Sequence, residues 1–216
     1  MYPTTIVEDF FSDPDAIVKY AEDLEYSPSP TGHWPGVRSK HIGEINFNLF
    51  QYIGNKIYSL FHSTPAERCV IDMWFQLITP YHEDKWNPLN RGWVHRDTFS
   101  NFGGIIYLTK NPEKDTGTSI YKEVEGYYYQ TENETKNKRN HFLGNGVPEK
   151  EYSESWKRNQ SQYLETVKVE NVYNRMLMFN SKTHHAVKTY GTKPRLTIAF
   201  FSNGEIGSNV YPPLYR

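Results

Sequence analysis

Two imidazoles and a carboxylate, far apart in the chain, offer the ligands of a metal centre. His95 and Asp97 lie two residues apart in the segment WVHRD, and on an extended strand such side chains share a face. A further imidazole follows at His184 or His185. Two histidines and one carboxylate bind one face of a metal and leave the other open, which suits non-haem Fe(II) that must bind a co-substrate and O2.

Only one of the two adjacent histidines can join such a centre, because neighbouring residues on a strand point to opposite faces. His185 shares a face with Val187, whereas His184 shares one with Lys188. A lysine beside a divalent cation is unfavourable. We therefore predict that His185 is the third ligand.

Arg195 begins a strongly apolar strand, where burying a guanidinium is costly without a partner. One interpretation is an arginine that reaches water at the strand end. The other is a clamp for a dicarboxylate, since a guanidinium matches carboxylate geometry and Thr197 adds a hydroxyl on the same face. Tyr107, which shares a strand face with Ile105, is a further candidate, because a buried tyrosine hydroxyl needs a partner.

The elements that position these residues are mainly strands. Aromatic residues make up 16% of the 216 residues and suit a pleated surface. Two helices come first, one starting at Pro14 with Ser12 or Asp13 as its cap and one over 46–62. We expect a barrel-like or sandwich-like β core with these helices outside. The predicted strands span 70–78, 102–108, 118–122, 126–130, 163–169, 176–179, 184–190 and 196–202.

A polar stretch at 131–162 interrupts the strands and is too long for an ordinary turn. We expect either a solvated insertion or a mobile lid, because long loops in compact domains often carry function. Its short basic run at 136–139 is expected to be solvated.

Charge and targeting features narrow the class of protein. The 24 basic and 25 acidic residues give a net charge of −1, so neither nucleic acid nor an anionic membrane is an expected partner. The start of the chain lacks the features of a signal peptide, no apolar stretch approaches a membrane span, and Cys69 is the single cysteine. We expect one cytoplasmic domain over 1–216, with helical support at 1–66 and the β core at 67–216.

Taken together, these motifs resemble the Fe(II)- and 2-oxoglutarate-dependent dioxygenases, particularly the prolyl-hydroxylase-like group. The resemblance covers roughly 74–201 and rests on His95-x-Asp97, on the strand ending at Tyr107, and on His185-x-Val187 followed by Arg195. Four segments further resemble a poorly characterised bacterial and phage branch of this superfamily. They are 34–39 (WPGVRS), 117–121 (GTSIY), 174–179 (NRMLMF) and 195–201 (RLTIAFF).

The resemblance implies a double-stranded β-helix, or jelly roll, that hydroxylates a protein side chain or small molecule with release of succinate and CO2. Related halogenases have a small residue in place of this carboxylate, so that chloride can bind, and the presence of Asp97 implies hydroxylation or a related oxidation rather than halogenation. The implied Fe(II) ligands are His95, Asp97 and His185. The residues implied for 2-oxoglutarate are Arg195, Tyr107 and Thr197. Candidates for supporting or substrate contacts are Gln76, Ile105, Val187 and His184.

Two other functions are compatible with the sequence. One is a non-catalytic jelly-roll binding module, which would form no succinate from 2-oxoglutarate. The other is a cupin-like metal enzyme without 2-oxoglutarate, such as an isomerase, which would not need Arg195.

Overall fold

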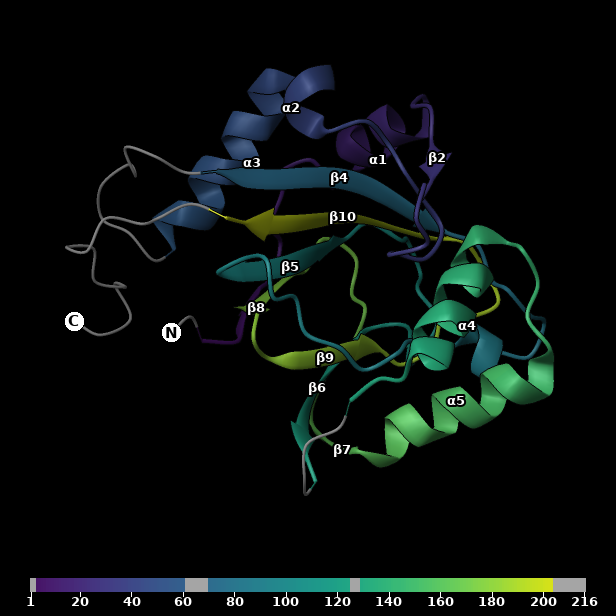
Figure 1. Ribbon diagram of the computed structural model, residues 1–216. Helices are drawn as coiled ribbons and strands as arrows, with labels where there is room; N and C mark the ends of the chain where they lie inside the picture. The colour runs from purple at the N-terminus through teal and green to yellow at the C-terminus, as the bar shows by residue number, and fades with distance from the viewer. Residues whose placement is uncertain (1–2, 61–69, 125–128, 204–216) are drawn as a thin grey trace.

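The computed structural model describes residues 3–60, 70–124 and 129–203, and within them two antiparallel sheets build a jelly roll (Figure 1). The larger sheet has the strand order β1 (Thr5–Val7), β8 (Met176–Asn180), β5 (Phe102–Tyr107), β10 (Arg195–Ser202), β4 (Ile71–Ile78), β3 (Val37–Arg38) and β2 (Ser27–Pro28). The smaller sheet has the order β7 (Tyr163–Val169), β6 (Thr118–Glu123) and β9 (His184–Val187). The predicted mainly β fold is confirmed.

Three N-terminal helices cover the outer face of the larger sheet, as Figure 1 shows. They are α1 (Pro14–Glu22), α2 (Ile42–Ile45) and α3 (Phe47–Ser59). The Asp13 side chain caps α1 by accepting a hydrogen bond from the Ala16 amide, and Asn46 caps α3 in the same way. The placement of these helices outside the β core is confirmed, although residues 61–62 of the second predicted helix lie outside the described residues.

The central strands of the larger sheet divide their side chains between two environments. Ile198 and Phe200 of β10 point into the apolar core beneath the helices, where both are fully buried. Arg195, Thr197 and Ala199 alternate with them and line a cavity on the other face. Burial of each large apolar side chain contributes roughly 1.5–3 kcal/mol, so this alternation fixes the register and thereby the cavity lining.

Most predicted strands agree with the structure to within a few residues. The strand expected at 184–190 ends at Val187, because the amides of Lys188 and Thr189 donate to carbonyls of the 115–117 loop instead of a neighbouring strand. Within the strand expected at 126–130, residues 126–128 lie outside the described residues and Tyr129 and Gln130 are not in a strand.

The 131–162 stretch differs from the expected long loop, because it forms α4 (Glu132–Leu143) and α5 (Glu149–Ser161), which pack at one end of the sheets in Figure 1. Thr131 and Glu134 form a capping box at the start of α4. Phe142, Tyr152 and Trp156 are buried against Trp93 in a separate apolar cluster. A few large aromatic side chains therefore anchor helices that are otherwise polar. None of the described helices combines the length and apolar character needed to cross a membrane.

Candidate metal centre

The three predicted ligand residues lie together where the two sheets approach each other. The His95 amide donates to the His185 carbonyl at 3.1 Å, and the His185 amide donates to the His95 carbonyl at 2.8 Å. The Asp97 amide donates to the Ser181 carbonyl at 2.8 Å. Backbone pairing thus brings together segments that are distant in sequence, with His185 on β9 and His95 in an isolated bridge to it.

The side chains of these residues converge to within metal-binding reach. One ligand atom each from His95, Asp97 and His185 lies within 4.8 Å of the other two. The Asp97 carboxylate oxygens are 3.9 Å from His95 Nε2 and 3.5 Å from His185 Nε2. Two imidazoles and a carboxylate on one side of a shared space form the donor set that non-haem Fe(II) prefers.

Hydrogen bonds hold both imidazoles in the orientation that metal binding needs. Nδ1 of His95 is 2.8 Å from the Trp93 carbonyl, and Nδ1 of His185 is 2.9 Å from the Thr183 carbonyl. A carbonyl oxygen can only accept a hydrogen bond, so each Nδ1 carries the proton. Each Nε2 therefore keeps its lone pair for a metal.

The pKa of His95 is lowered well below its usual value, first by desolvation and next by the neighbouring His185. Its side chain is 44% accessible, yet this surface opens onto the cavity and protein atoms surround the ring. A low pKa keeps the imidazole neutral, which is the protonation state of a metal ligand.

Helix α5 holds the segment that carries His95. The Asn159 carboxamide accepts a hydrogen bond from the Val94 amide at 2.9 Å and donates one to the Val94 carbonyl at 3.1 Å. Trp156 Nε1 donates to the Gly92 carbonyl at 3.0 Å. Residues without any predicted role therefore position a candidate ligand by fixing its backbone.

A cavity of about 580 Å³ contains the three candidate ligands and extends from them to Arg195. Arg195 is 4% exposed, and its Nε donates to the Thr116 carbonyl at 3.0 Å. Its Nη2 is buried without a hydrogen-bond partner. Desolvation lowers the pKa of Arg195, and the neighbouring Tyr107 and Tyr190 oppose this shift. A buried donor without a partner is costly and marks a place for an acceptor on a ligand.

The other residues predicted to hold the co-substrate occupy two different environments. Thr197 lines the cavity, whereas Tyr107 is fully buried behind it, with its hydroxyl donating to Thr118 Oγ1 at 2.9 Å. Thr118 lines the cavity in turn, although sequence reasoning gave it no role. Tyr107 still packs against a residue of the site, because its ring centroid lies 5.4 Å from the Arg195 guanidinium carbon.

The four remaining candidates also separate. Gln76, Ile105 and Val187 line the cavity. The structure does not bring His184 there, since its Nε2 lies 3.4 Å from a Glu123 carboxylate oxygen and its ring centroid lies 4.9 Å from that of Tyr163.

Several cavity residues were missed by sequence reasoning. The Arg38 guanidinium lies over the rings of Trp34 and Trp74, at 4.5 and 5.2 Å from their centroids. Lys138 of α4 also lines the cavity and is partly buried, so the expectation of a fully solvated basic run at 136–139 is wrong for this residue. Only the WPGVRS segment gave a signal, because it contains Trp34 and Arg38.

The fold defined above is that of the Fe(II)- and 2-oxoglutarate-dependent oxygenases. HygX from Streptomyces hygroscopicus, solved with nickel and 2-oxoglutarate bound, matches with a TM-score of 0.54 and 12% identity, covering 94% of this chain and 83% of its own. A Trichoplax adhaerens prolyl hydroxylase, in complex with a peptide fragment of the hypoxia-inducible-factor oxygen degradation domain, matches with a TM-score of 0.54 and 11% identity over 92% and 82%. A 2OG-Fe(II) oxygenase-family oxidoreductase from Burkholderia pseudomallei gives 0.54 and 13% over 95% and 88%.

The chain belongs to the family described as a family of unknown function, DUF6445, whose match spans residues 2–197. This agrees with the predicted placement in a poorly characterised branch. No curated protein matches the chain in sequence. The structural matches share so little sequence that they bear on the fold alone.

Proposed function

We propose that the protein is an Fe(II)- and 2-oxoglutarate-dependent oxygenase that hydroxylates a small molecule or a protein side chain. The observation that carries this proposal is the pairing of two features in one cavity. One is the cluster of His95, Asp97 and His185, and the other is the buried Arg195 with an unsatisfied Nη2. A metal alone would explain the first feature but not the second.

The donor set fits the cofactor and co-substrate. His95, Asp97 and His185 would hold Fe(II), while Arg195 and the hydroxyls of Thr197 and Thr118 would hold the distal carboxylate of 2-oxoglutarate. When bound, these groups supply the O2-dependent oxidation that converts 2-oxoglutarate to succinate and CO2 while hydroxylating a substrate.

The protein's own residues orient this chemistry and limit the access of water. The backbone carbonyls of Trp93 and Thr183 keep the two imidazoles turned toward the metal position. Apolar side chains such as Ile105 and Phe179 line the same cavity and reduce the water around it.

The alternative of a cupin-like enzyme is disfavoured by Arg195, which such an enzyme would leave without an anionic partner. Among the described residues that line the cavity, Asp97 is the one carboxylate, and it belongs to the metal cluster. A non-catalytic binding module would share the geometry but not the turnover, so the two must be separated by assay.

The test is succinate formation from 2-oxoglutarate in the presence of Fe(II), O2 and ascorbate, together with metal content after dialysis. We expect the wild type to retain one Fe(II) and form succinate, and Asp97→Ala and His185→Ala to lose both properties. His184→Ala is the matched control and should keep the metal. Iron retained by His185→Ala but lost by His184→Ala would contradict the ligand assignment, and bound metal without succinate would favour the binding module.

A further inference from the structure

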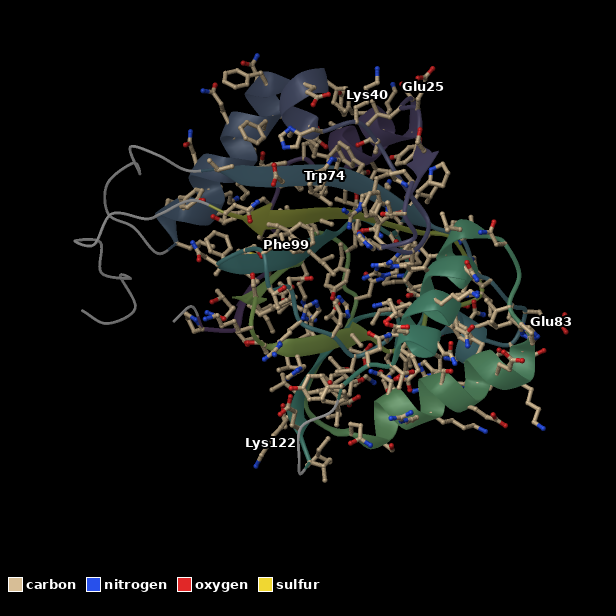
Figure 2. All side chains as sticks on the ribbon, viewed as in Figure 1. Glu25, Lys40, Trp74, Glu83, Phe99 and Lys122 are labelled. Atoms are coloured by element: carbon tan, nitrogen blue, oxygen red, sulfur yellow. The ribbon has the colours of Figure 1, made fainter. Side chains whose placement is uncertain are left out.

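One wall of the cavity, formed by β3, β4 and the end of β10, carries a positive charge that the proposed function does not use. The Arg38 guanidinium carbon lies 4.5 Å from the Trp34 ring centroid, 5.2 Å from that of Trp74 and 5.8 Å from that of Phe201. Phe99 extends the same aromatic wall, with its ring centroid 5.4 Å from that of Phe201. Figure 2 labels Trp74 on β4 and Phe99 in the loop before β5, which locate this wall.

Two buried hydrogen-bond donors in this wall have no acceptor. They are Nε of Arg38 and Nε1 of Trp34. Arg38 uses one other nitrogen, since its Nη2 donates to Gln76 Oε1 at 3.2 Å. Because leaving buried donors unpaired is costly, their presence in the lining of a cavity points to a ligand that supplies acceptors.

Lys138 adds a second cation from α4, on the same cavity. Desolvation lowers the pKa of Lys138 to about 8 and that of Arg38 to about 10, and the Asp97 carboxylate opposes both shifts. Both side chains therefore remain charged at neutral pH, although burial disfavours their charge. Among the described lining residues, no carboxylate other than Asp97 is present to offset them.

The charge balance of the loaded site, which rests on the proposed function, leaves these two cations uncompensated. The two positive charges of Fe(II) and one of Arg195 match the Asp97 carboxylate and the two carboxylates of 2-oxoglutarate. Once a metal neutralises Asp97, Arg38 and Lys138 lose their nearest anion. Desolvated cations without a counter-charge are expensive, so an anionic substrate would relieve the cost.

We propose that the substrate is a small carboxylic acid with an apolar, ring-sized body, whose carboxylate is held by Arg38, Lys138 and the indole N–H of Trp34. The aromatic wall of Trp74, Phe99 and Phe201 would contact the apolar body. A free small molecule fits better than a peptide, because the segment before β3 and helix α4 are in backbone contact beside the cavity. The backbone at Gly32 lies so close to that of Arg139 that a Cβ at Gly32 would collide with the Arg139 carbonyl.

The test uses the full-length protein loaded with Fe(II) and 2-oxoglutarate without O2, and three probes. They are 3-phenylpropionate, its neutral amide and 2-phenylethyl phosphate. Probe affinity and retained 2-oxoglutarate are both measured by equilibrium dialysis. We expect the acid to bind at least about tenfold more tightly than the amide, as the loss of charge-assisted hydrogen bonds predicts.

Variants separate this inference from a general packing effect. Lys138→Met and Arg38→Gln should each weaken binding of the acid about tenfold or more while leaving the amide and 2-oxoglutarate unaffected. Lys136→Met is the matched control, since Lys136 is exposed on the same helix and does not line this cavity. Lys138→Met alone decides the matter if Arg38→Gln fails to fold.

The possible failures differ in meaning. Equal affinity for acid and amide, no binding of either, or an unchanged acid affinity in Lys138→Met would overturn the inference while retained 2-oxoglutarate leaves the proposed function standing. Preference for the phosphate would also overturn the assignment of a carboxylic acid. If the wild type fails to retain 2-oxoglutarate, the proposed function itself is wrong.

Discussion

Arg195→Met should separate binding of 2-oxoglutarate from stability of the protein. Methionine keeps much of the length and apolar character of the side chain but removes its charge and donors. The substitution loses the 3.0 Å hydrogen bond from Nε to the Thr116 carbonyl, worth about 1 kcal/mol. It also removes the buried, unsatisfied Nη2, whose burial costs roughly 1–3 kcal/mol. The unfolding free energy of the metal-free protein should therefore stay within about 1 kcal/mol of the wild type, or rise.

The loss of affinity should be much larger. Each charge-assisted hydrogen bond to the distal carboxylate contributes about 1.5–3 kcal/mol, so losing the two bonds of a guanidinium fork predicts at least about a hundredfold weaker binding. At a 2-oxoglutarate concentration of about 100 times the wild-type Kd, the ligand stabilises the metal-loaded wild type by about 2.7 kcal/mol. The same concentration should stabilise the variant by only about 0.4 kcal/mol.

The assay is denaturant unfolding with and without 2-oxoglutarate, in protein loaded with Mn(II), accompanied by calorimetric titration of 2-oxoglutarate. Arg96→Met is the control for loss of a positive charge near the centre, since Arg96 is exposed between His95 and Asp97 and does not line the cavity. Equal stabilisation of Arg195→Met and the wild type would refute the clamp. A loss of several kcal/mol in the metal-free protein would show that Arg195 serves the fold instead.

Three further predictions concern α4 and α5. Asn159→Ala should lower metal affinity about 10- to 100-fold in a Mn(II) titration, because it frees the backbone beside His95, and an unchanged affinity would remove α5 from the positioning of the site. Lys138→Met should raise the unfolding free energy at pH 7 by about 1 kcal/mol, since it removes the cost of a partly buried cation. In the wild type that cost falls as pH rises from about 8 toward 10.5, because over this range the unfolded chain holds a proton that the folded protein has released. The unfolding free energies of the two proteins should therefore converge over this range. Parallel pH profiles would contradict the lowered pKa of Lys138. Affinity for 3-phenylpropionate should decline above about pH 8 in the wild type, as Lys138 loses its proton, and the decline should be absent in Lys138→Met.

The strands and the convergence of His95, Asp97 and His185 could be predicted because their signals are local or periodic. Alternation of apolar and polar residues along β4 and β10 reports the two environments of the sheet directly. The spacing of His95 and Asp97 and the opposite faces of His184 and His185 follow from strand geometry alone. The prediction that separated His184 from the cluster agrees with its contact to Glu123.

The helical pair α4 and α5 could not be predicted from amphipathicity. Their anchoring depends on a few aromatic residues, which do not form a continuous apolar stripe. The available signal was in the caps, since Thr131 and Glu134 have the spacing of a capping box and Gly144 ends α4 with a φ of 73°. The sequence signal for Arg38 was weaker still, because β3 has only two residues and the pairing of Arg38 with Gln76 is set by tertiary structure.

The residues proposed to bind the metal and 2-oxoglutarate and those proposed to bind the substrate come from elements that are held in different ways. Thr197 and Arg195 belong to β10, which hydrogen-bonds to strands on both sides, and His185 lies on β9, which pairs with β6. Arg38 and Lys138 come from a two-residue strand and a helix whose supporting backbones touch at Gly32 and Arg139. We expect substitutions in these outer elements to change which molecule is bound without moving the candidate metal ligands, because backbone pairing between other segments holds those ligands. We therefore expect relatives that keep His95, Asp97, His185 and Arg195 to share the proposed reaction. Those that differ at Trp34, Arg38 and Lys138 should differ in substrate.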